Sequence, residues 1–308
     1  MSVALFTHPS ALGHDTGPGH PECADRVRYI LRVLEGREFE TLLREEAPRA
    51  PVEALGLAHS HAHINAILAL PSDRLTYIDG DTVFGPGTLE AALRGVGGAM
   101  AAVDAVMEGR AKAAFVAMRP PGHHAETDRA MGFCLFNNAA VAAYHARARW
   151  GVRRVAVVDF DVHHGNGTQE IFWSEPELFY ASSHQHPCYP GTGMEDERGV
   201  AGNVVNAPLP PGSGGKEFRA AWEGRIIPAL AAFRPELLII SAGFDAHEAD
   251  PLAQLRLREG DFAWVTEALL AVAAAHYPGR VVSLLEGGYD LEALAASVAA
   301  HVRALMQL

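Results

Sequence analysis

The densest group of reactive side chains in the sequence is DFDVHHGNGTQ, residues 159–169. It follows the apolar run Val155–Val158 and contains two aspartates and two adjacent histidines within six residues. Taking a carboxylate or an imidazole out of water is costly unless the group is paired or bound to a metal. Their presence at the end of a strand that looks buried therefore indicates chemistry rather than packing.

A metal site is the first interpretation of this stretch. Asp161 and His163 lie two positions apart, so in an extended chain both side chains point to the same side. A carboxylate and an imidazole suit a divalent metal with oxygen and nitrogen ligands, and Asp245 is the candidate third ligand. Three protein ligands leave one position open, as in a catalytic site. The alternatives are an Asp–His pair that closes a loop and, for Asp245, the N-terminal cap of a helix.

Two further histidines, His123 and His124, end the segment RPPGHH. In a loop, both rings can point into one cleft, where one imidazole accepts a proton from water. Each ring then needs a partner on its other nitrogen, and Asp159 and Asn166 are the candidates.

Tyr289 lies in the segment EGGYD, after Gly287 and Gly288. The two glycines let the backbone approach a ligand closely. A tyrosine hydroxyl can donate a hydrogen bond to a developing oxyanion. The alternative is an aromatic side chain packed beside a glycine turn.

The scaffold that must position these residues is predicted to be a parallel α/β sheet. Short β-branched runs alternate with longer Ala/Leu-rich segments, which is typical of a parallel sheet with helices on both faces. We expect strands at Val3–Thr7, Ala114–Met118, Val155–Asp159, Leu178–Ser182, Leu237–Ser241 and Val281–Leu285. We expect helices at Ala24–Gly36, His61–Ala69, Pro86–Met107, Asn137–Trp150, Gly215–Phe233, Glu259–Ala275 and Leu291–Met306. The Gly/Pro-rich segment Gln185–Gly215 is expected to be a long loop.

The polar motifs follow four different predicted strands. RPPGHH comes after Met118, DFDVHH after Val158, SAGFDAH after Ile240 and EGGYD after Leu285. In open α/β sheets, sites form at the carboxyl ends of the strands. We therefore expect the four motifs to converge on one site.

Composition limits the class of protein. The chain has 308 residues, of which 49% are hydrophobic and 20% charged, as in a soluble globular protein, and we expect a single domain over residues 1–308. The net charge of −12 argues against binding to a nucleic-acid backbone, although it would tolerate a cationic substrate. Three well-separated cysteines argue against a disulfide framework.

The N-terminal sequence MSVALFTHPS lacks the features of a signal peptide, and no apolar run approaches the length of a membrane span. We therefore expect a cytoplasmic protein with no membrane partner. The sequence leaves the oligomeric state open, and a homo-oligomer is compatible with it.

Taken together, the motifs resemble the zinc-dependent histone deacetylase superfamily, which includes bacterial histone deacetylase-like amidohydrolases and acetylpolyamine amidohydrolases. The similar segments run in order from GHPE at 19–22 to EGGYDL at 286–291, which is nearly the whole chain. Asn166, where class I proteins usually have aspartate, is typical of the class II branch. The further similar segments are GFCLFNN at 132–138 and YPGTG at 189–193.

The resemblance implies an arginase/deacetylase α/β fold with a central, mostly parallel, eight-stranded sheet. It implies hydrolysis of linear amides, with Zn²⁺ held by Asp161, His163 and Asp245. His124, paired with Asn166, would be the general base and acid. It also implies that His123, paired with Asp159, is an electrostatic partner and that Tyr289 polarises the substrate carbonyl.

The resemblance also assigns residues to substrate and to a structural potassium ion. Gly132, Phe133 and Tyr189 would line an acyl-lysine tunnel, Asp81 would hold the substrate backbone at the rim, and the Gly287–Gly288 turn would border the substrate. Potassium would lie among Asp159, Asp161, His163 and Ser182, with a second ion near Phe172.

Leu252 bears on the substrate. Polyamine-specific relatives often carry an acidic residue seven positions after the last zinc aspartate, and here that position is Leu252. An apolar side chain cannot pair with an ammonium group, so acyl-lysine or another slender amide is favoured. Acetylpolyamines and small-molecule amides, including xenobiotic ones, remain the alternative.

A catalytically silent module that binds acylated ligands is disfavoured because the metal ligands, both histidines and Tyr289 are all present. His164 receives no firm role beyond supporting its neighbours.

Overall fold

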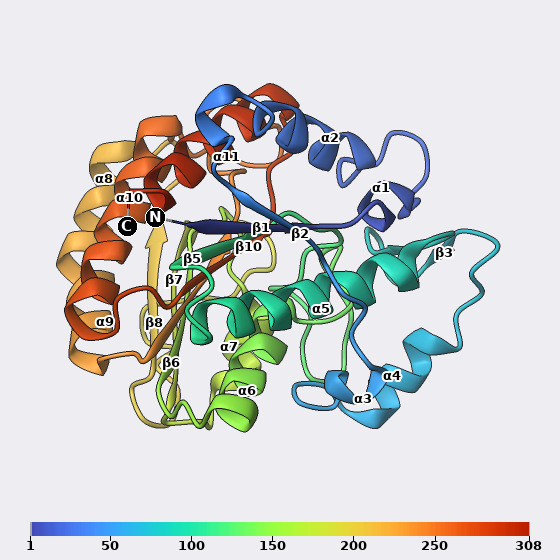
Figure 1. Ribbon diagram of the computed structural model, residues 1–308, viewed down its shortest axis with the longest axis horizontal. Helices are drawn as coiled ribbons and strands as arrows, with labels where there is room; N and C mark the ends of the chain where they lie inside the picture. The colour runs from blue at the N-terminus through green and yellow to red at the C-terminus, as the bar shows by residue number, and fades with distance from the viewer. Residues whose placement is uncertain (1, 308) are drawn as a thin grey trace.

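The computed structural model, which describes residues 2–307, is built around one large sheet (Figure 1). Its strands are β1 (Val3–Thr7), β2 (Leu43–Glu46), β5 (Ala113–Val116), β6 (Val155–Asp159), β7 (Leu178–Gln185), β8 (Val204–Leu209), β9 (Leu237–Ala242) and β10 (Val281–Leu285). Their spatial order is β2-β1-β5-β10-β9-β6-β7-β8, and all neighbouring pairs are parallel. The expected eight-stranded parallel sheet is confirmed.

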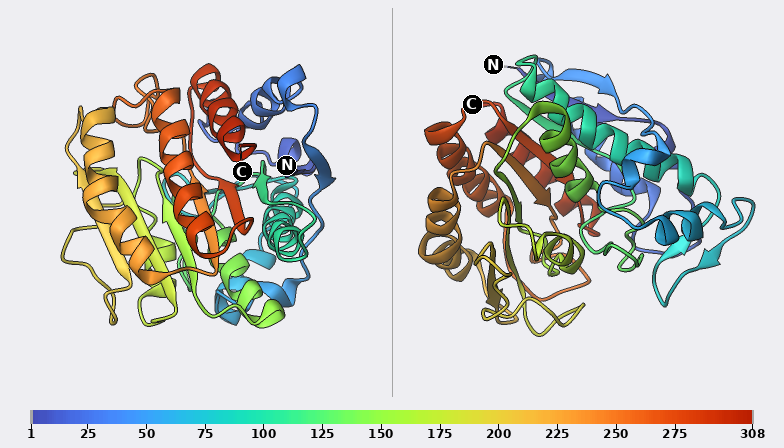
Figure 2. Two further views of the ribbon diagram at one scale, coloured as in Figure 1. Left: turned by 60° about the vertical axis from the view of Figure 1, so that its left-hand side comes forward. Right: turned by 90° about the horizontal axis from the view of Figure 1, so that it is seen from below.

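Helices cover both faces of this sheet (Figure 2). They are α1 (Ser10–Gly13), α2 (Ala24–Val33), α3 (Val52–Leu55), α4 (His61–Leu68), α5 (Thr88–Met107), α6 (Asn138–Trp150), α7 (Asn166–Phe172), α8 (Gly215–Ala221), α9 (Ile227–Phe233), α10 (Glu259–His276) and α11 (Leu291–Leu305). Helices α5 and α6 pack together against one face, whereas α2, α10 and α11 form a layer on the other. Within residues 2–307, no helix has the length and apolarity to cross a membrane.

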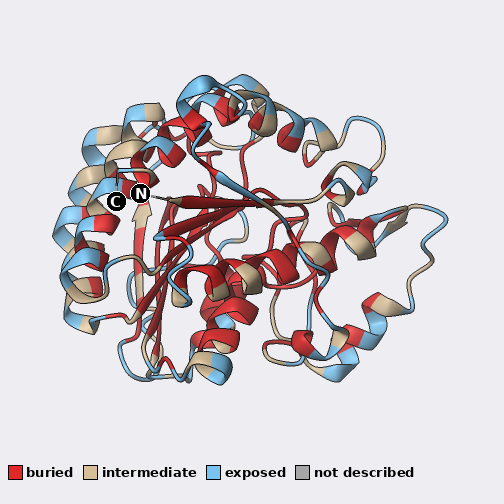
Figure 3. Ribbon diagram, viewed as in Figure 1, coloured by how far each residue is buried: buried red, intermediate tan, exposed pale blue. Residues whose placement is uncertain are grey.

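The central strands are apolar on both sides because helices bury both faces of the sheet (Figure 3). Strands β5, β6, β9 and β10 are buried at every position. This explains why their sequences are nearly continuous runs of Val, Ile, Leu and Ala rather than alternating patterns. It also means that the loops leaving these strands start from rigid positions.

The prediction of a long loop over Gln185–Gly215 is wrong in part, because this segment contains strand β8. Strand β8 lies at the edge of the sheet and carries Pro208, which is tolerated there because an edge strand has an unpaired side. Strand β2, at the opposite edge, is largely exposed and charged, so it lacks an apolar signature. A small antiparallel hairpin, β3 (Thr76–Tyr77) with β4 (Val83–Phe84), was not predicted either.

The single helix predicted over Gly215–Phe233 is interrupted. Between α8 and α9 the chain forms a π-helical segment, η2 (Trp222–Ile226). Pro228, near the start of α9, has no N–H to donate to a carbonyl one turn earlier, which is consistent with altered hydrogen bonding at this point.

Four adjacent strands of the sheet, β5, β10, β9 and β6, are those followed by the polar motifs. Because the strands are parallel, their carboxyl ends meet at the same edge. The expected convergence of the four motifs is therefore confirmed, and it occurs at the middle of the sheet.

Candidate active site

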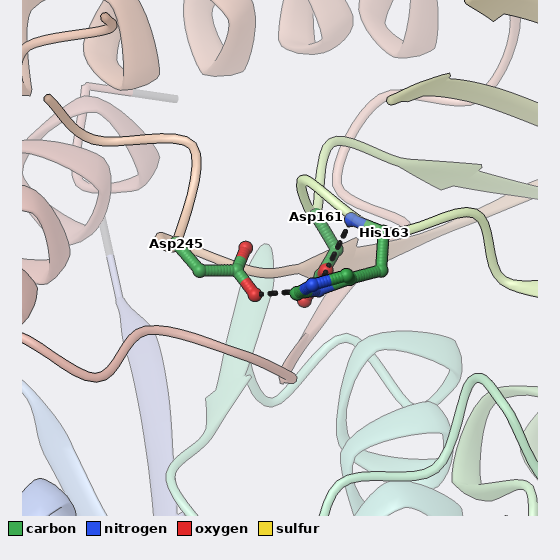
Figure 4. Close-up of side chains that lie close together, drawn as sticks. All are labelled: Asp161, His163 and Asp245. Atoms are coloured by element: carbon green, nitrogen blue, oxygen red, sulfur yellow. Dashed lines mark hydrogen bonds and ion pairs between the residues drawn. The ribbon is translucent and has the colours of Figure 1, made fainter. Parts of the chain in front are cut away.

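A cluster of three buried side chains, which we call the metal corner, lies at the carboxyl ends of β6 and β9. It consists of Asp161, His163 and Asp245 (Figure 4). One potential ligand atom from each residue lies within 4.8 Å of the other two. The Nδ1 atom of His163 is 3.2 Å from Oδ1 of Asp161 and 3.1 Å from Oδ2 of Asp245. The three residues predicted as ligands thus lie together.

Backbone N–H groups hold the two carboxylates in place. The N–H of Gly287 donates to Oδ2 of Asp161 over 2.8 Å, and the N–H of Val162 donates to Oδ1 of Asp245 over 2.9 Å. The other oxygen of each carboxylate is thereby turned toward the imidazole. This orientation is set by loops from different strands, so the corner is preorganised by the sheet.

The donor set of the metal corner fits a divalent ion. Both carboxylates are almost completely inaccessible to water. Burial and the nearby charge of Asp161 raise the pKa of Asp245 to about 7. Burial opposes ionisation of Asp161 too, but His123 and His163 hold its pKa below the usual range. Two buried carboxylates beside one imidazole are stabilised by a cation bound between them, and zinc accepts both carboxylate oxygen and imidazole nitrogen as ligands.

His123 lies beside the metal corner and faces carboxylates. Its Nδ1 atom is 3.0 Å from Oδ2 of Asp159, and its Nε2 atom is 3.8 Å from Oδ2 of Asp161. Burial disfavours a charge on this ring, but the charges of Asp161 and Asp159 outweigh burial and raise the pKa of His123 to about 10. These two carboxylates therefore favour the charged form of the His123 ring.

His124 has a different partner. Its Nδ1 atom is 2.8 Å from Oδ1 of Asn166. The Nδ2 group of Asn166 donates to Glu126 over 2.7 Å, which fixes the orientation of the amide. Because an amide oxygen only accepts, His124 must carry its proton on Nδ1, and Nε2 is left with a lone pair. Burial and the positive charge of His123 lower the pKa of His124 well below its usual value, so the ring is neutral.

A cavity of about 210 Å³ opens above these residues. It is lined by Asp81, His124, Gly132, Phe133, His163, Tyr189, Leu252 and Tyr289. The ring of Tyr189 packs edge-on against His124, with the ring centres 5.1 Å apart, and Phe133 packs in the same way against Tyr289 at 5.8 Å. Polar groups thus form the base of the cavity, and aromatic side chains form its walls.

Tyr189 and Leu252 are the exposed residues of the lining, so they mark the mouth of the cavity, and Asp81 is partly exposed. Contact of these three residues with substrate stays a prediction. Phe133, in the wall, has a positive φ of 68°, a conformation that is uncommon for a residue other than glycine. Its N–H donates to the hydroxyl of the buried Thr82 over 3.1 Å, which helps to hold this conformation. Within residues 2–307, Gly287 and Gly288 lie outside the cavity lining, and their contact with substrate stays a prediction.

The residues predicted to surround potassium lie partly together. Asp159 and Ser182 are direct partners in the pairing of β6 with β7, and Asp161 and His163 follow Asp159 in the chain. The hydroxyl of Ser182 is 2.8 Å from Nδ1 of His184. Phe172 ends α7, and its carbonyl oxygen accepts a hydrogen bond from Asn203.

A buried charge cluster beside Tyr289 was not predicted from the sequence. Glu22 binds Arg119 through two hydrogen bonds of 2.6 and 2.7 Å and binds Arg26 at 3.0 Å. Arg26 donates to the carbonyl of Gly288 and lies 4.8 Å from the centre of the Tyr289 ring. Glu22 and Arg119 belong to the segments GHPE and RPPGHH, but the sequence does not show that these two charged residues are partners.

Glu286 is a second residue whose part was not predicted, although it begins EGGYD. Its Oε2 atom accepts from the N–H groups of Gly122 and His123, at 2.7 and 3.2 Å, and Oε1 accepts from the Ser241 hydroxyl. Burial raises the pKa of Glu286 to about 7. Glu286, which follows β10, thus joins the loop after β5 to strand β9.

Comparisons with known proteins agree with this geometry. Residues 20–305 match the family model of the histone deacetylase domain. An uncharacterized protein of Synechocystis sp. is 41% identical over 308 residues, which cover 99% of each chain. A histone deacetylase-like amidohydrolase of Pseudomonas aeruginosa is 41% identical over 92% of this chain and 74% of its own length. The crystal structure of the HDA15 HD domain superposes with a TM-score of 0.93 at 35% identity, covering 99% of this chain and 88% of the other. The expected family resemblance and fold are confirmed.

Proposed function

The chain belongs to the histone deacetylase domain family, and from this premise we propose that it is a Zn²⁺-dependent amide hydrolase that removes acetyl or another short acyl group from acyl-lysine or a similarly slender amide. Deacetylase or amidohydrolase chemistry follows from the family. The observation that carries the finer proposal is the meeting of the metal corner, the neutral His124 and Tyr289 at one cavity. Asp161, His163 and Asp245 would hold the zinc ion.

The bound ion would polarise the amide carbonyl and lower the pKa of a water molecule. His124 accepts the proton of the attacking water at Nε2, because its Nδ1–H is occupied by Asn166. The same nitrogen then returns the proton to the departing amine. The products are a carboxylic acid, acetate in the simplest case, and a free amine.

His123 and Tyr289 contribute electrostatically to the proposed hydrolysis. His123, held by Asp159, disfavours a second positive charge on the neighbouring His124, so His124 is ready to accept the water proton. Burial raises the pKa of Tyr289 well above its usual value, so its hydroxyl stays protonated. That hydroxyl donates a hydrogen bond to the substrate oxygen as negative charge develops on it.

The shape of the cavity supports a slender substrate. A volume of about 210 Å³, with Phe133 and Tyr189 as walls, suits an acyl group on an apolar stem such as the side chain of acyl-lysine. Leu252 at the mouth offers no charge to an ammonium group. Asp81 favours the alternative substrates, acetylpolyamines and cationic small amides, because it also lines the cavity and a carboxylate can pair with an ammonium group.

A side-by-side measurement of kcat/KM tests the proposal. The panel comprises an acetyl-lysine peptide, a trifluoroacetyl-lysine reporter, acetylputrescine, acetylspermidine and several neutral small amides. We expect the highest value for an acyl-lysine substrate. Preference for the polyamines would select the alternative, and no hydrolysis of any amide by the zinc-loaded protein would refute the proposal.

We also propose that K⁺ binds near Asp159 and Ser182, because these buried oxygen-bearing side chains are adjacent across two strands. Such an ion would offset part of the negative charge below the metal corner. Two expectations stay predictions: a second potassium ion near Phe172 and a cytoplasmic location. The absence of nucleic-acid and membrane partners also stays a prediction, and the oligomeric state stays open.

A further inference from the structure

His164 directly follows the metal-corner residue His163, is almost fully buried and does not line the cavity. Both of its ring nitrogens are nevertheless used. Nδ1 is 2.8 Å from the hydroxyl of Thr192, and Nε2 is 2.9 Å from Oε1 of Gln169. His164 therefore connects helix α7, which carries Gln169, to the connection between β7 and β8, which carries Thr192.

The directions of these hydrogen bonds are fixed by Gln169. Its Oε1 also accepts from Nδ2 of Asn206 over 2.7 Å, and its Nε2 donates to Glu197 over 2.6 Å. Because the carboxylate of Glu197 accepts, the amide oxygen of Gln169 must face His164. His164 then donates from Nε2 and accepts the Thr192 hydroxyl at Nδ1.

Glu197 links Gln169 back to the connection between β7 and β8, the segment that also carries Thr192. Its carboxylate accepts from the N–H of Gly193 at 3.0 Å and from the N–H of Met194 at 2.9 Å. Gly193 has a φ of +91°, and a Cβ atom there would lie 2.6 Å from the ring of His164. The backbone thus approaches the imidazole as closely as only glycine permits. We call His164, Gln169 and Glu197 the rim anchor.

The rim anchor holds the loop that carries Tyr189. The residues that the rim anchor contacts are Thr192, Gly193 and Met194, which begin three positions after Tyr189. The centre of the Tyr189 ring is 5.1 Å from that of His124 and 6.3 Å from that of His163. On the other side of Tyr189, Gln185 is fixed by two hydrogen bonds to Gln254, of 2.6 and 2.7 Å. Tyr189 itself is 39% exposed, so contacts made by its neighbours must hold it against the cavity.

We propose that the rim anchor positions Tyr189 and thereby sets the length of acyl chain that the cavity accepts. This inference rests on the proposed amide hydrolysis and extends it to acyl selectivity. His164, Gln169 and Glu197 are positioning residues, because they act on substrate through Tyr189. Loosening the anchor lets the Tyr189 wall move outward, which weakens binding of a short acyl group and relieves the exclusion of longer ones.

The main test is Gln169→Met, which keeps the length of the side chain but removes its hydrogen bonds at both ends. Thr192→Val is a milder variant that removes only the hydroxyl, and Thr192→Ser is its matched control. The first measurement is tryptic cleavage of the zinc-loaded protein after Arg198, an exposed residue between β7 and β8 in the connection held by the rim anchor. Cleavage should be several-fold faster in Gln169→Met than in the parent or in Thr192→Ser.

The second measurement compares acetyl-lysine and butyryl-lysine peptides with the zinc-loaded protein. For Gln169→Met we expect KM for the acetyl peptide to rise about tenfold with kcat little changed, since three hydrogen bonds of modest strength are lost. The ratio of kcat/KM for acetyl over butyryl should fall. Thr192→Val should move in the same direction by about threefold, and Thr192→Ser should match the parent.

The outcomes separate this inference from the proposed function. Unchanged cleavage at Arg198, or a loss of kcat and of bound zinc with selectivity intact, would overturn the rim anchor as the positioning device. A parent protein that is inactive on every amide would overturn the proposed function and the selectivity role with it. Faster cleavage together with the loss of acetyl preference would support the inference.

Discussion

The base and the mouth of the cavity are built in different ways. The base residues Asp161 and Asp245 are 0% and 1% exposed and follow central strands of the sheet. The mouth residues Tyr189 and Leu252 are 39% and 36% exposed and lie in loops. The base is therefore held by the most rigid part of the fold, whereas the mouth depends on hydrogen bonds among loops. This division assigns the chemistry to the base and the choice of substrate to the mouth.

The largest effect should follow from removing a metal ligand at the base of the cavity. Asp161→Ala or His163→Ala removes one of three ligands and leaves the remaining buried groups without a bound cation. We expect loss of bound zinc and of measurable activity, checked by metal analysis and by kcat/KM on an acetyl-lysine peptide. Asp15→Asn, on an exposed loop, is the control and should retain both. Activity that persists in a metal-free Asp161→Ala protein would contradict the account.

Removing His124, the residue proposed to accept the water proton, should have the next largest effect. His124→Ala should lower kcat by about 10²–10⁴-fold while zinc stays bound, because the water loses its proton acceptor. Metal content and steady-state kinetics check this at once. If kcat is unchanged, proton transfer does not pass through Nε2 of His124.

Tyr289→Phe should have a somewhat smaller effect, because it removes one hydrogen bond to the developing oxyanion and leaves the metal corner intact. We expect kcat to fall by about 10²–10³-fold with KM changed much less. Pre-steady-state or steady-state kinetics on the trifluoroacetyl-lysine reporter measure the split. An effect confined to KM would mean that Tyr289 only lines the cavity and does not stabilise the oxyanion.

The smallest effect on catalysis, and the sharpest test of the division, is a change at the mouth. Leu252→Glu should raise kcat/KM for acetylspermidine by about threefold, since a carboxylate near the rim can pair with the distal ammonium, while zinc content stays as in the parent. Leu252→Gln has similar size without the charge and should show little gain. Equal gains for both variants would mean that charge at the mouth does not select the amine.

The same division explains what could be predicted from the sequence. The central strands and the four motifs at their ends were found because a buried parallel strand is an apolar run and a polar residue at its end stands out. The edge strands β2 and β8 were missed because one is charged and exposed and the other contains Pro208 within a Gly/Pro-rich segment.

Contacts between distant segments were the second limit. The hydrogen bond from Phe133 to Thr82 and the stacking of Arg26 on Tyr289 join residues that are 51 and 263 positions apart. No periodicity or spacing in the sequence reports such a pairing. His164 shows the same limit, since its partners Gln169 and Thr192 become evident only once α7 and the β7–β8 connection are placed side by side.

The central claim is that a metal ion bound by Asp161, His163 and Asp245 is required for amide hydrolysis. Stepwise addition of Zn²⁺ to chelator-treated protein, with bound zinc and acetate release from an acetyl-lysine peptide measured on the same samples, tests it most directly. We predict that activity rises in proportion to bound zinc and reaches its maximum at about one ion per chain. Full turnover by the metal-free protein, or zinc binding without any gain in acetate release, would contradict the account.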